Sequence, residues 1–281
     1  MSEFLHAVAE HAFLQHALLA GVLAGIACGV VGSYVVVRRI TAIAGGIAHC
    51  VLGGLGAARY LQVVHGWTWI QPIHGAVAAA IVAAVVIGLV SLRAREREDT
   101  AIGALWALGM ATGILFISRT PGYNEDLMSY LFGNILLVRS TDLWLMVLLD
   151  LVVVGIGLLL YPQLQAVCFD EEFARLRGLK VELYYLLLLC LTALTVVLLV
   201  SVVGIVMVIA LLTIPVAIAG HVVHTLRQMM VVASLLAMAF TTTGLALSYG
   251  PDLPAGATTI VLAGAVYLLV LAGRWLVRKL A

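Results

Sequence analysis

The chain has 281 residues, of which 64% are hydrophobic and only 10% are charged, and its formal net charge is +1. A soluble domain normally carries about 25% charged residues. The composition therefore excludes an ordinary soluble protein. The net charge says nothing about nucleic acid, but the sequence has no basic cluster suited to phosphate backbones, so we expect no nucleic-acid partner. The four cysteines show no CxxC spacing, so we expect free thiols.

Apolar stretches follow one another along the chain, and a membrane-spanning helix needs about 20 such residues. The stretches cover 13–37, 40–61, 73–92, 101–118, 143–161, 183–201, 204–219, 229–249 and 257–276. The sixth and seventh are separated by only two residues, so the number of complete crossings is eight or nine. The sequence predicts an all-α polytopic membrane protein in one transmembrane domain, residues 1–281, with lipid as its surroundings.

Two features of these stretches concern helix packing. Gly21, Gly25 and Gly29 lie four residues apart and are expected to form a groove that lets a neighbouring helix approach closely. Pro215 lies inside stretch 204–219 and is expected to bend or break it. A shorter apolar run, LMSYLFGNILLV (127–138), predicts a re-entrant or interfacial helix.

The distribution of basic residues predicts the orientation, because lysine and arginine concentrate in cytoplasmic loops. With the N-terminus outside and the C-terminus in the cytoplasm, 12 of the 15 Lys and Arg residues face the cytoplasm. These are Arg38, Arg39, Arg93, Arg95, Arg97, Arg175, Arg177, Lys180, Arg227, Arg274, Arg278 and Lys279.

The segment 168–182, CFDEEFARLRGLKVE, is the densest charged run and falls on the predicted cytoplasmic side. Its pattern predicts a short helix in which Asp170 caps the N-terminus, Glu171 and Arg175 suit the helix dipole, and Gly178 ends the helix. Phe169, Phe173 and Leu176 would form one apolar face. The segment fits either a helix on the membrane surface or a lever that docks into a soluble partner.

Four stretches resemble one family, the permease subunits of ATP-binding-cassette (ABC) importers for zinc, manganese or iron. They are FDEEFARLRGL, VVGIVMVIALLTIPVAIA, LMSYLFGNILLV and IAHCVLGGLG, in the family's order along nearly the whole chain. The resemblance implies a permease fold that works as a dimer in the bacterial inner membrane. It also implies a separate cytoplasmic ATPase and a periplasmic or lipid-anchored metal-binding protein.

The resemblance makes segment 168–182 the part that grips the ATPase, with Asp170, Glu171, Phe173, Ala174, Arg175, Leu176 and Gly178 as coupling residues. Phe173 and Leu176 can fill a groove, and Ala174 permits close approach. The chain contains no GxxxxGK[ST] phosphate loop, so ATP must be bound by another subunit and the chain itself is not expected to be an enzyme.

His49 is the leading metal-pathway residue, because it lies within a span and its imidazole suits first-row divalent ions. A packing histidine is the alternative. The family usually has Asp four residues earlier, where this chain has Gly45. Asp150 lies in an apolar span and either replaces that carboxylate or is a hydrogen-bonded acid at a helix interface.

We expect no tightly bound cofactor; the metal is cargo, and zinc is slightly favoured over manganese because position 45 has lost its hard carboxylate ligand. The alternative function is a secondary metal transporter driven by an ion gradient. Such a transporter would need no ATPase and would place His49, Asp150 and Pro215 at broken helices.

Overall fold

The computed structural model describes residues 2–93, 98–121, 133 and 135–280. Within these ranges the regular elements are all helices, and eight of them are long and apolar enough to cross a membrane. These eight are α2 (Ala12–Val37), α3 (Thr41–Val64), α4 (Pro72–Arg93), α5 (Glu98–Ser118), α7 (Ser140–Leu159), α10 (Val181–Val203), α12 (Leu226–Tyr249) and α13 (Ala255–Leu280). The prediction of an all-α polytopic membrane protein is confirmed.

Five shorter elements complete the described chain: α1 (Ser2–Glu10), the 3-10 turn η1 (Ile135–Leu137), α8 (Tyr161–Phe169), α9 (Glu171–Leu176) and α11 (Ile205–Ala219). The sequence did not predict α1 or α8. Most of the expected re-entrant helix at 127–138 lies outside the described residues; of its positions, 135–137 form η1.

The helix α11 is separated from α10 by a single residue, Gly204, whose φ of 82° is available to glycine at no steric cost. Pro215 lies inside α11 and does not end it, so of the two expected effects, a bend or a break, the break does not occur. Pro215 and Val216 are buried, and α2 packs closely on this part of α11 at Gly32. Neighbouring helices of this kind allow membrane helices to tolerate proline.

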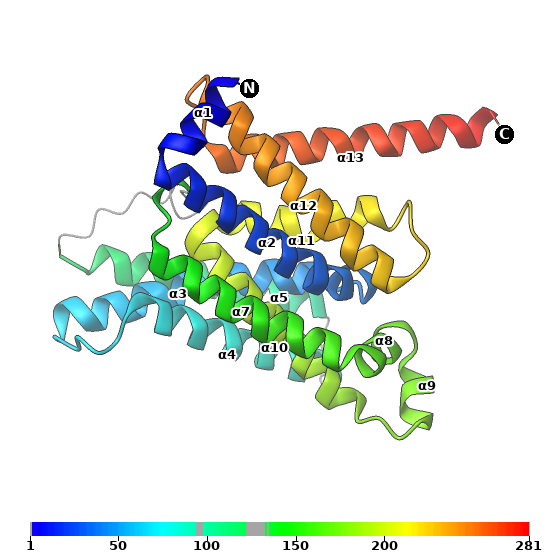
Figure 1. Cartoon of the computed structure of the whole chain (residues 1–281). Coiled ribbons are helices and arrows are strands. Elements are labelled where there is room, and N and C mark those ends of the chain that lie inside the picture. The colour runs from blue at the N-terminus through cyan, green and yellow to red at the C-terminus, as the bar shows by residue number, and fades with distance from the viewer. Residues whose placement is uncertain (1, 94–97, 122–132, 134, 281) are drawn as a thin grey trace.

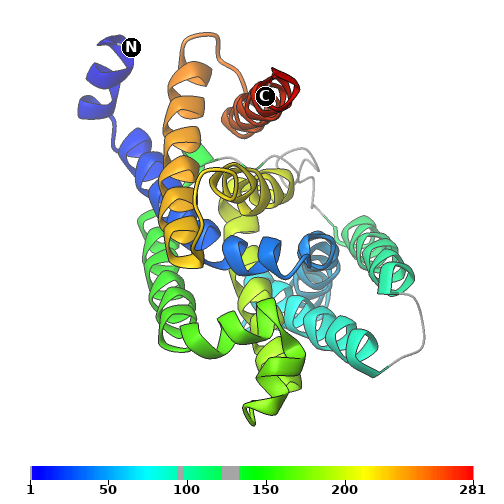
Figure 2. The ribbon, with the colours of Figure 1, turned by 90° about the vertical axis from the view of Figure 1, so that its right-hand side faces the viewer.

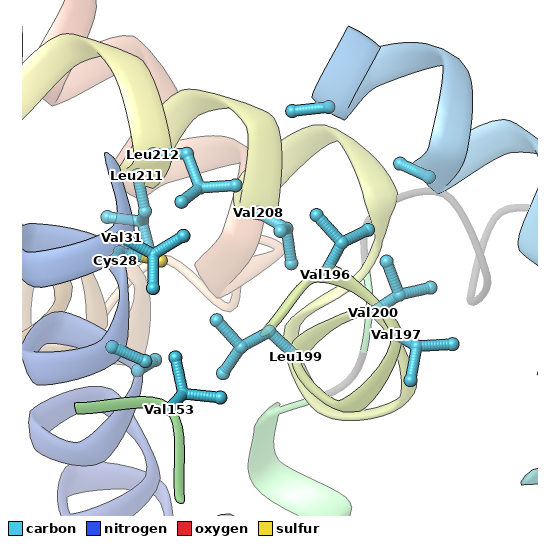
Figure 3. Close-up of a cluster of buried hydrophobic side chains, with 14 of the residues drawn as sticks. Cys28, Val31, Val153, Val196, Val197, Leu199, Val200, Val208, Leu211 and Leu212 are labelled. Atoms are coloured by element: carbon cyan, nitrogen blue, oxygen red, sulfur yellow. The ribbon is translucent and has the colours of Figure 1, made fainter. Parts of the chain in front are cut away.

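The centre of the bundle is α10, which contacts α2, α3, α4, α7 and α11 as well as the two short helices α8 and α9. Figure 3 shows side chains of α10 meeting those of α2, α7 and α11, including Val31, Val153, Leu199 and Leu211. All four are buried. This core links the helices that span the bundle to the short helices at one end.

The long helices lie side by side, and α8 and α9 lie together at one end of the bundle (Figure 1). The C-terminus lies toward that end and the N-terminus toward the other. Figure 2 shows α5 and α13 at the edge of the bundle. In their apolar windows only 11% of α5 residues and 6% of α13 residues are buried, so these two helices leave the most surface free for lipid or a partner.

The predicted glycine groove on α2 receives α12. A Cβ atom added at Gly21 would lie 3.0 Å from the Thr241 hydroxyl, and one at Gly29 would lie 2.5 Å from the backbone nitrogen of Ser234. Such distances leave no room for a methyl group unless the two helices separate.

We therefore expect Gly29→Ala to lower the free energy of unfolding by about 1–3 kcal/mol, because the new methyl group meets backbone that cannot move aside. Thermal unfolding of the detergent-purified protein measures this. The control is Gly155→Ala in α7, where nothing lies within 4 Å of the added Cβ. An equal loss of stability in both variants would show that the α2–α12 contact is not tight.

Candidate functional site

His49 lies on α3 and is half-buried. Its ring stacks on the indole of Trp106 from α5, with ring centroids 4.3 Å apart and an interplanar angle of 9°. The Nδ1 atom of His49 is buried and has no hydrogen-bond partner within the described part of the chain. An imidazole that is oriented by stacking and has a nitrogen without a hydrogen-bond partner is suited to bind a metal ion in passage, because neutral imidazole is a good ligand for first-row divalent ions.

The close packing of α3 against α5 brings these two rings together. A Cβ atom at Gly53 would lie 2.8 Å from the carbonyl oxygen of Gly109, and one at Gly56 would lie equally close to the carbonyl oxygen of Gly113. The adjacent Cys50 thiol donates a hydrogen bond to the carbonyl oxygen of Leu105, 3.2 Å away. Sequence reasoning missed Trp106, since an aromatic residue in an apolar span gives no signal of its partner.

The position of the missing carboxylate, Gly45, lies one turn before His49 on the same side of α3. Among the described residues outside the same stretch of helix, a Cβ atom there would have one neighbour within 4 Å, the Ile209 Cδ1 atom of α11 at 3.9 Å. The structure thus has room for a side chain at this position. Within the described residues no three His, Cys, Asp or Glu side chains cluster to hold a metal ion, so His49 is not part of a closed multi-ligand site in a single copy.

The carboxyl group of Asp150 occupies a different place. Asp150 is 9% exposed, and its Oδ2 atom has no hydrogen-bond partner in the described structure. It lies close to the buried Cys28 of α2 and lines a groove of about 380 Å³ whose walls come from α2 and α7. None of the residues that line this groove belongs to α3, so the structure does not bring Asp150 and His49 to one site.

The charged segment forms a distinct helix, α9, with the caps expected from its sequence. The Asp170 carboxylate accepts a hydrogen bond from the backbone N–H of Phe173 at 2.9 Å. Gly178 has a φ of 77° and ends the segment, and the backbone N–H of Leu179 returns to the carbonyl oxygen of Ala174. The helix is therefore held by its own backbone before any partner binds.

The side chains of α9 divide into two sets. Ala174 is fully buried with Val167 of α8 and Val181 of α10, so the close approach that it permits is that of α9 to its own chain. Leu176 is 87% exposed and Phe173 is half-exposed, and the Arg177 guanidinium lies over the Phe173 ring. This exposed face is apolar with a charged rim, as docking surfaces commonly are.

An ion pair ties this end to the rest of the chain, and a buried thiol lies near it. Glu171 of α9, expected from the sequence to be a coupling residue, forms an ion pair with Arg38 at the end of α2, so its carboxylate faces this chain and is not part of the exposed face. The thiol of Cys168 in α8 is buried, and burial raises its pKa to about 12 although the nearby Arg38 lowers it. That thiol therefore stays protonated and unreactive at neutral pH, in keeping with the four free cysteines.

Eight helices that are long and apolar enough to cross a membrane define an integral membrane protein within the described part of the chain. Comparison with known proteins agrees. The model of the ABC 3 transport family matches residues 10–274, and the chain belongs to this family. It is a multi-pass permease subunit of an ABC importer for metal ions, and the alternative of a gradient-driven transporter is excluded.

Individual relatives are also membrane proteins of metal transport systems. The "Probable metal transport system membrane protein" of Chlamydia trachomatis is 42% identical, over 90% of this chain and 86% of the relative. The manganese transport system membrane protein MntC of Listeria monocytogenes is 35% identical, over 95% and 92% of the two chains. The solved structure of PsaBC from Streptococcus pneumoniae has a TM-score of 0.84 and 28% identity, over 96% of this chain and 94% of that one.

The space at position 45 allows a direct test of whether the metal passes beside His49. We expect Gly45→Asp to fold as the wild type does and to shift uptake toward Mn²⁺ over Zn²⁺, because a carboxylate is a harder ligand than imidazole. Competitive uptake of the two ions into reconstituted vesicles measures the shift. The matched control is Gly45→Ala, which fills the same space without oxygen ligands. If Asp and Ala at position 45 change the preference equally, the metal does not pass this position.

Proposed function

We propose that this chain is the membrane subunit of an ATP-driven importer that carries a divalent first-row metal ion, with Mn²⁺ the first candidate. The half-buried His49 with its unpartnered Nδ1 atom is the observation that supports passage of a metal ion. The name of the Listeria relative supports manganese. Zinc remains the competing cargo, and the absence of a carboxylate at Gly45 is the reason to test both.

The importer works as a homodimer in this proposal. The two helices with the most uncovered surface are α5 and α13, and α5 also carries Trp106 beside His49. Two copies that meet along α5 would bring two His49 side chains toward one pathway. A pathway with few ligands suits transport, because an importer must release the ion that it binds.

A separate ATPase supplies the energy, since the sequence has no phosphate-binding loop. The exposed face of α9 docks into this ATPase on the cytoplasmic side, and a binding protein delivers the ion on the other side. This orientation follows from the basic residues, and it puts the N-terminus outside the cell membrane and the C-terminus in the cytoplasm. Closure of the ATPase dimer then moves α9 and opens the pathway alternately to each side.

The pathway role of His49 predicts that His49→Ala lowers Mn²⁺ uptake by about tenfold or more, because the metal loses its placed ligand. Uptake is measured in vesicles that contain the permease, the ATPase and the binding protein. The control is His65→Ala, at the far end of the same helix. Unchanged uptake in His49→Ala, with full ATPase association, would remove His49 from the pathway.

The docking role of α9 predicts that Leu176→Asp abolishes co-purification of the ATPase, because a charge replaces an apolar contact at the centre of the docking face. The control is Leu253→Asp, an exposed leucine in the turn between α12 and α13; that turn lies at the other end of the bundle (Figure 1). An ATPase that co-purifies with Leu176→Asp at the wild-type ratio would contradict the docking proposal.

A further inference from the structure

The ion pair between Arg38 and Glu171 joins the proposed coupling helix to the turn between α2 and α3. Arg38 ends α2, and Glu171 is the first residue of α9. The two side chains are only 24% and 31% exposed. A pair that is largely removed from water is less screened than a surface pair, and loss of one partner leaves the other charge poorly solvated.

Other side chains hold the Arg38 guanidinium in place. Its central carbon lies 5.3 Å from the centroid of the Tyr185 ring on α10, within the range of a cation–π contact. Tyr185 is buried, and its hydroxyl lies 3.2 Å from the hydroxyl of Ser91 on α4. The guanidinium thus lies between α9 and a support built from two membrane helices, of which Tyr185 is the buried part.

A second ion pair, Arg93–Glu182, is exposed to solvent and does not involve α9. Arg93 and Glu182 are 3.8 Å apart, and their side chains are 73% and 57% exposed. An exposed pair at that distance contributes about 0–1 kcal/mol. Among the described residues, Arg38–Glu171 is the ion pair that connects α9 to a membrane helix.

The turn that carries Arg38 is short and internally bonded. The backbone N–H of Ile40 donates to the carbonyl oxygen of Val35 at 3.0 Å, and Arg39 has a φ of 63°. The helix α3 begins directly after this turn at Thr41, and His49 follows eight residues later, which corresponds to a rise of about 12 Å. A displacement of Arg38 therefore acts on the N-terminal end of α3, the helix that carries His49.

We propose that Arg38 is a positioning residue that couples displacement of α9 to displacement of α3, so that the motion of the ATPase reaches the metal pathway through the Arg38–Glu171 pair. The inference depends on the proposed docking of α9. It assigns to Arg38 no contact with the metal and none with the ATPase. Its loss would leave a complex that assembles and hydrolyses ATP but moves fewer ions for each ATP.

The test compares Arg38→Gln, Glu171→Gln and the double variant in vesicles that contain the complete importer. The measurement is Mn²⁺ taken up per ATP hydrolysed, together with co-purification of the ATPase. We expect each single variant to lower the ratio about fivefold or more, with the ATPase still bound at the wild-type stoichiometry. The double variant should lose no more than either single variant, because the two residues act as one unit.

Arg93→Gln and Glu182→Gln are the matched controls from the exposed pair and should leave the ratio unchanged. Arg38→Lys keeps the charge and should give an uptake per ATP between those of Arg38→Gln and the wild type. If Arg38→Gln fails to fold, Arg38→Lys and Glu171→Gln still test the proposal, because Glu171→Gln alters only a partly exposed side chain. An unchanged ratio, or losses that add in the double variant, would overturn the proposal.

Loss of the ATPase from Arg38→Gln would also overturn it, since Arg38 would then act in docking. The docking proposal fails through a different result, retention of the ATPase by Leu176→Asp, so the two failures can be told apart.

Discussion

The structure depends on how closely its helix backbones approach one another. In lipid the hydrophobic effect gives no drive for one apolar helix to bind another, so contact between helices must come from packing. Here small residues provide that packing: α2 meets α12 at Gly29, and α3 meets α4 where Gly54 faces Gly75. The helix α3 is thereby held from two sides, by α4 and by α5.

The character of the candidate metal site follows from this arrangement. Because α3 and α5 nearly touch at Gly53 and Gly109, the rings of His49 and Trp106 are stacked and the imidazole has a fixed orientation. The same small residues leave space beside it at Gly45. A fixed ring with open space nearby favours brief binding of an ion over the closed, four-ligand coordination of a structural metal site.

At the end of the bundle that carries α8 and α9, charged side chains can be solvated, so helix caps and ion pairs contribute to the structure as well as packing. Asp170 caps α9 and Ala174 seats it against α8 and α10, so this short helix is ordered although it is far too short to be stable alone. Its larger apolar residues, Phe173 and Leu176, remain exposed. The partly buried Arg38–Glu171 pair is the polar link from this helix to α2.

The sequence by itself determined what depends on local pattern: the apolar spans, the caps of α9 at Asp170 and Gly178, and the position of His49 within a span. These features arise from residues near one another in the chain, whose spacing and chemistry can be read directly. Only the tertiary structure decided which helices meet. It stacked Trp106 on His49 and placed Asp150 in a groove between α2 and α7 to which α3 contributes no residue. It also turned Ala174 inward and paired Arg38 with Glu171. Each of these depends on contacts between distant segments, and a long apolar helix can present any of its faces to a neighbour until close packing selects one.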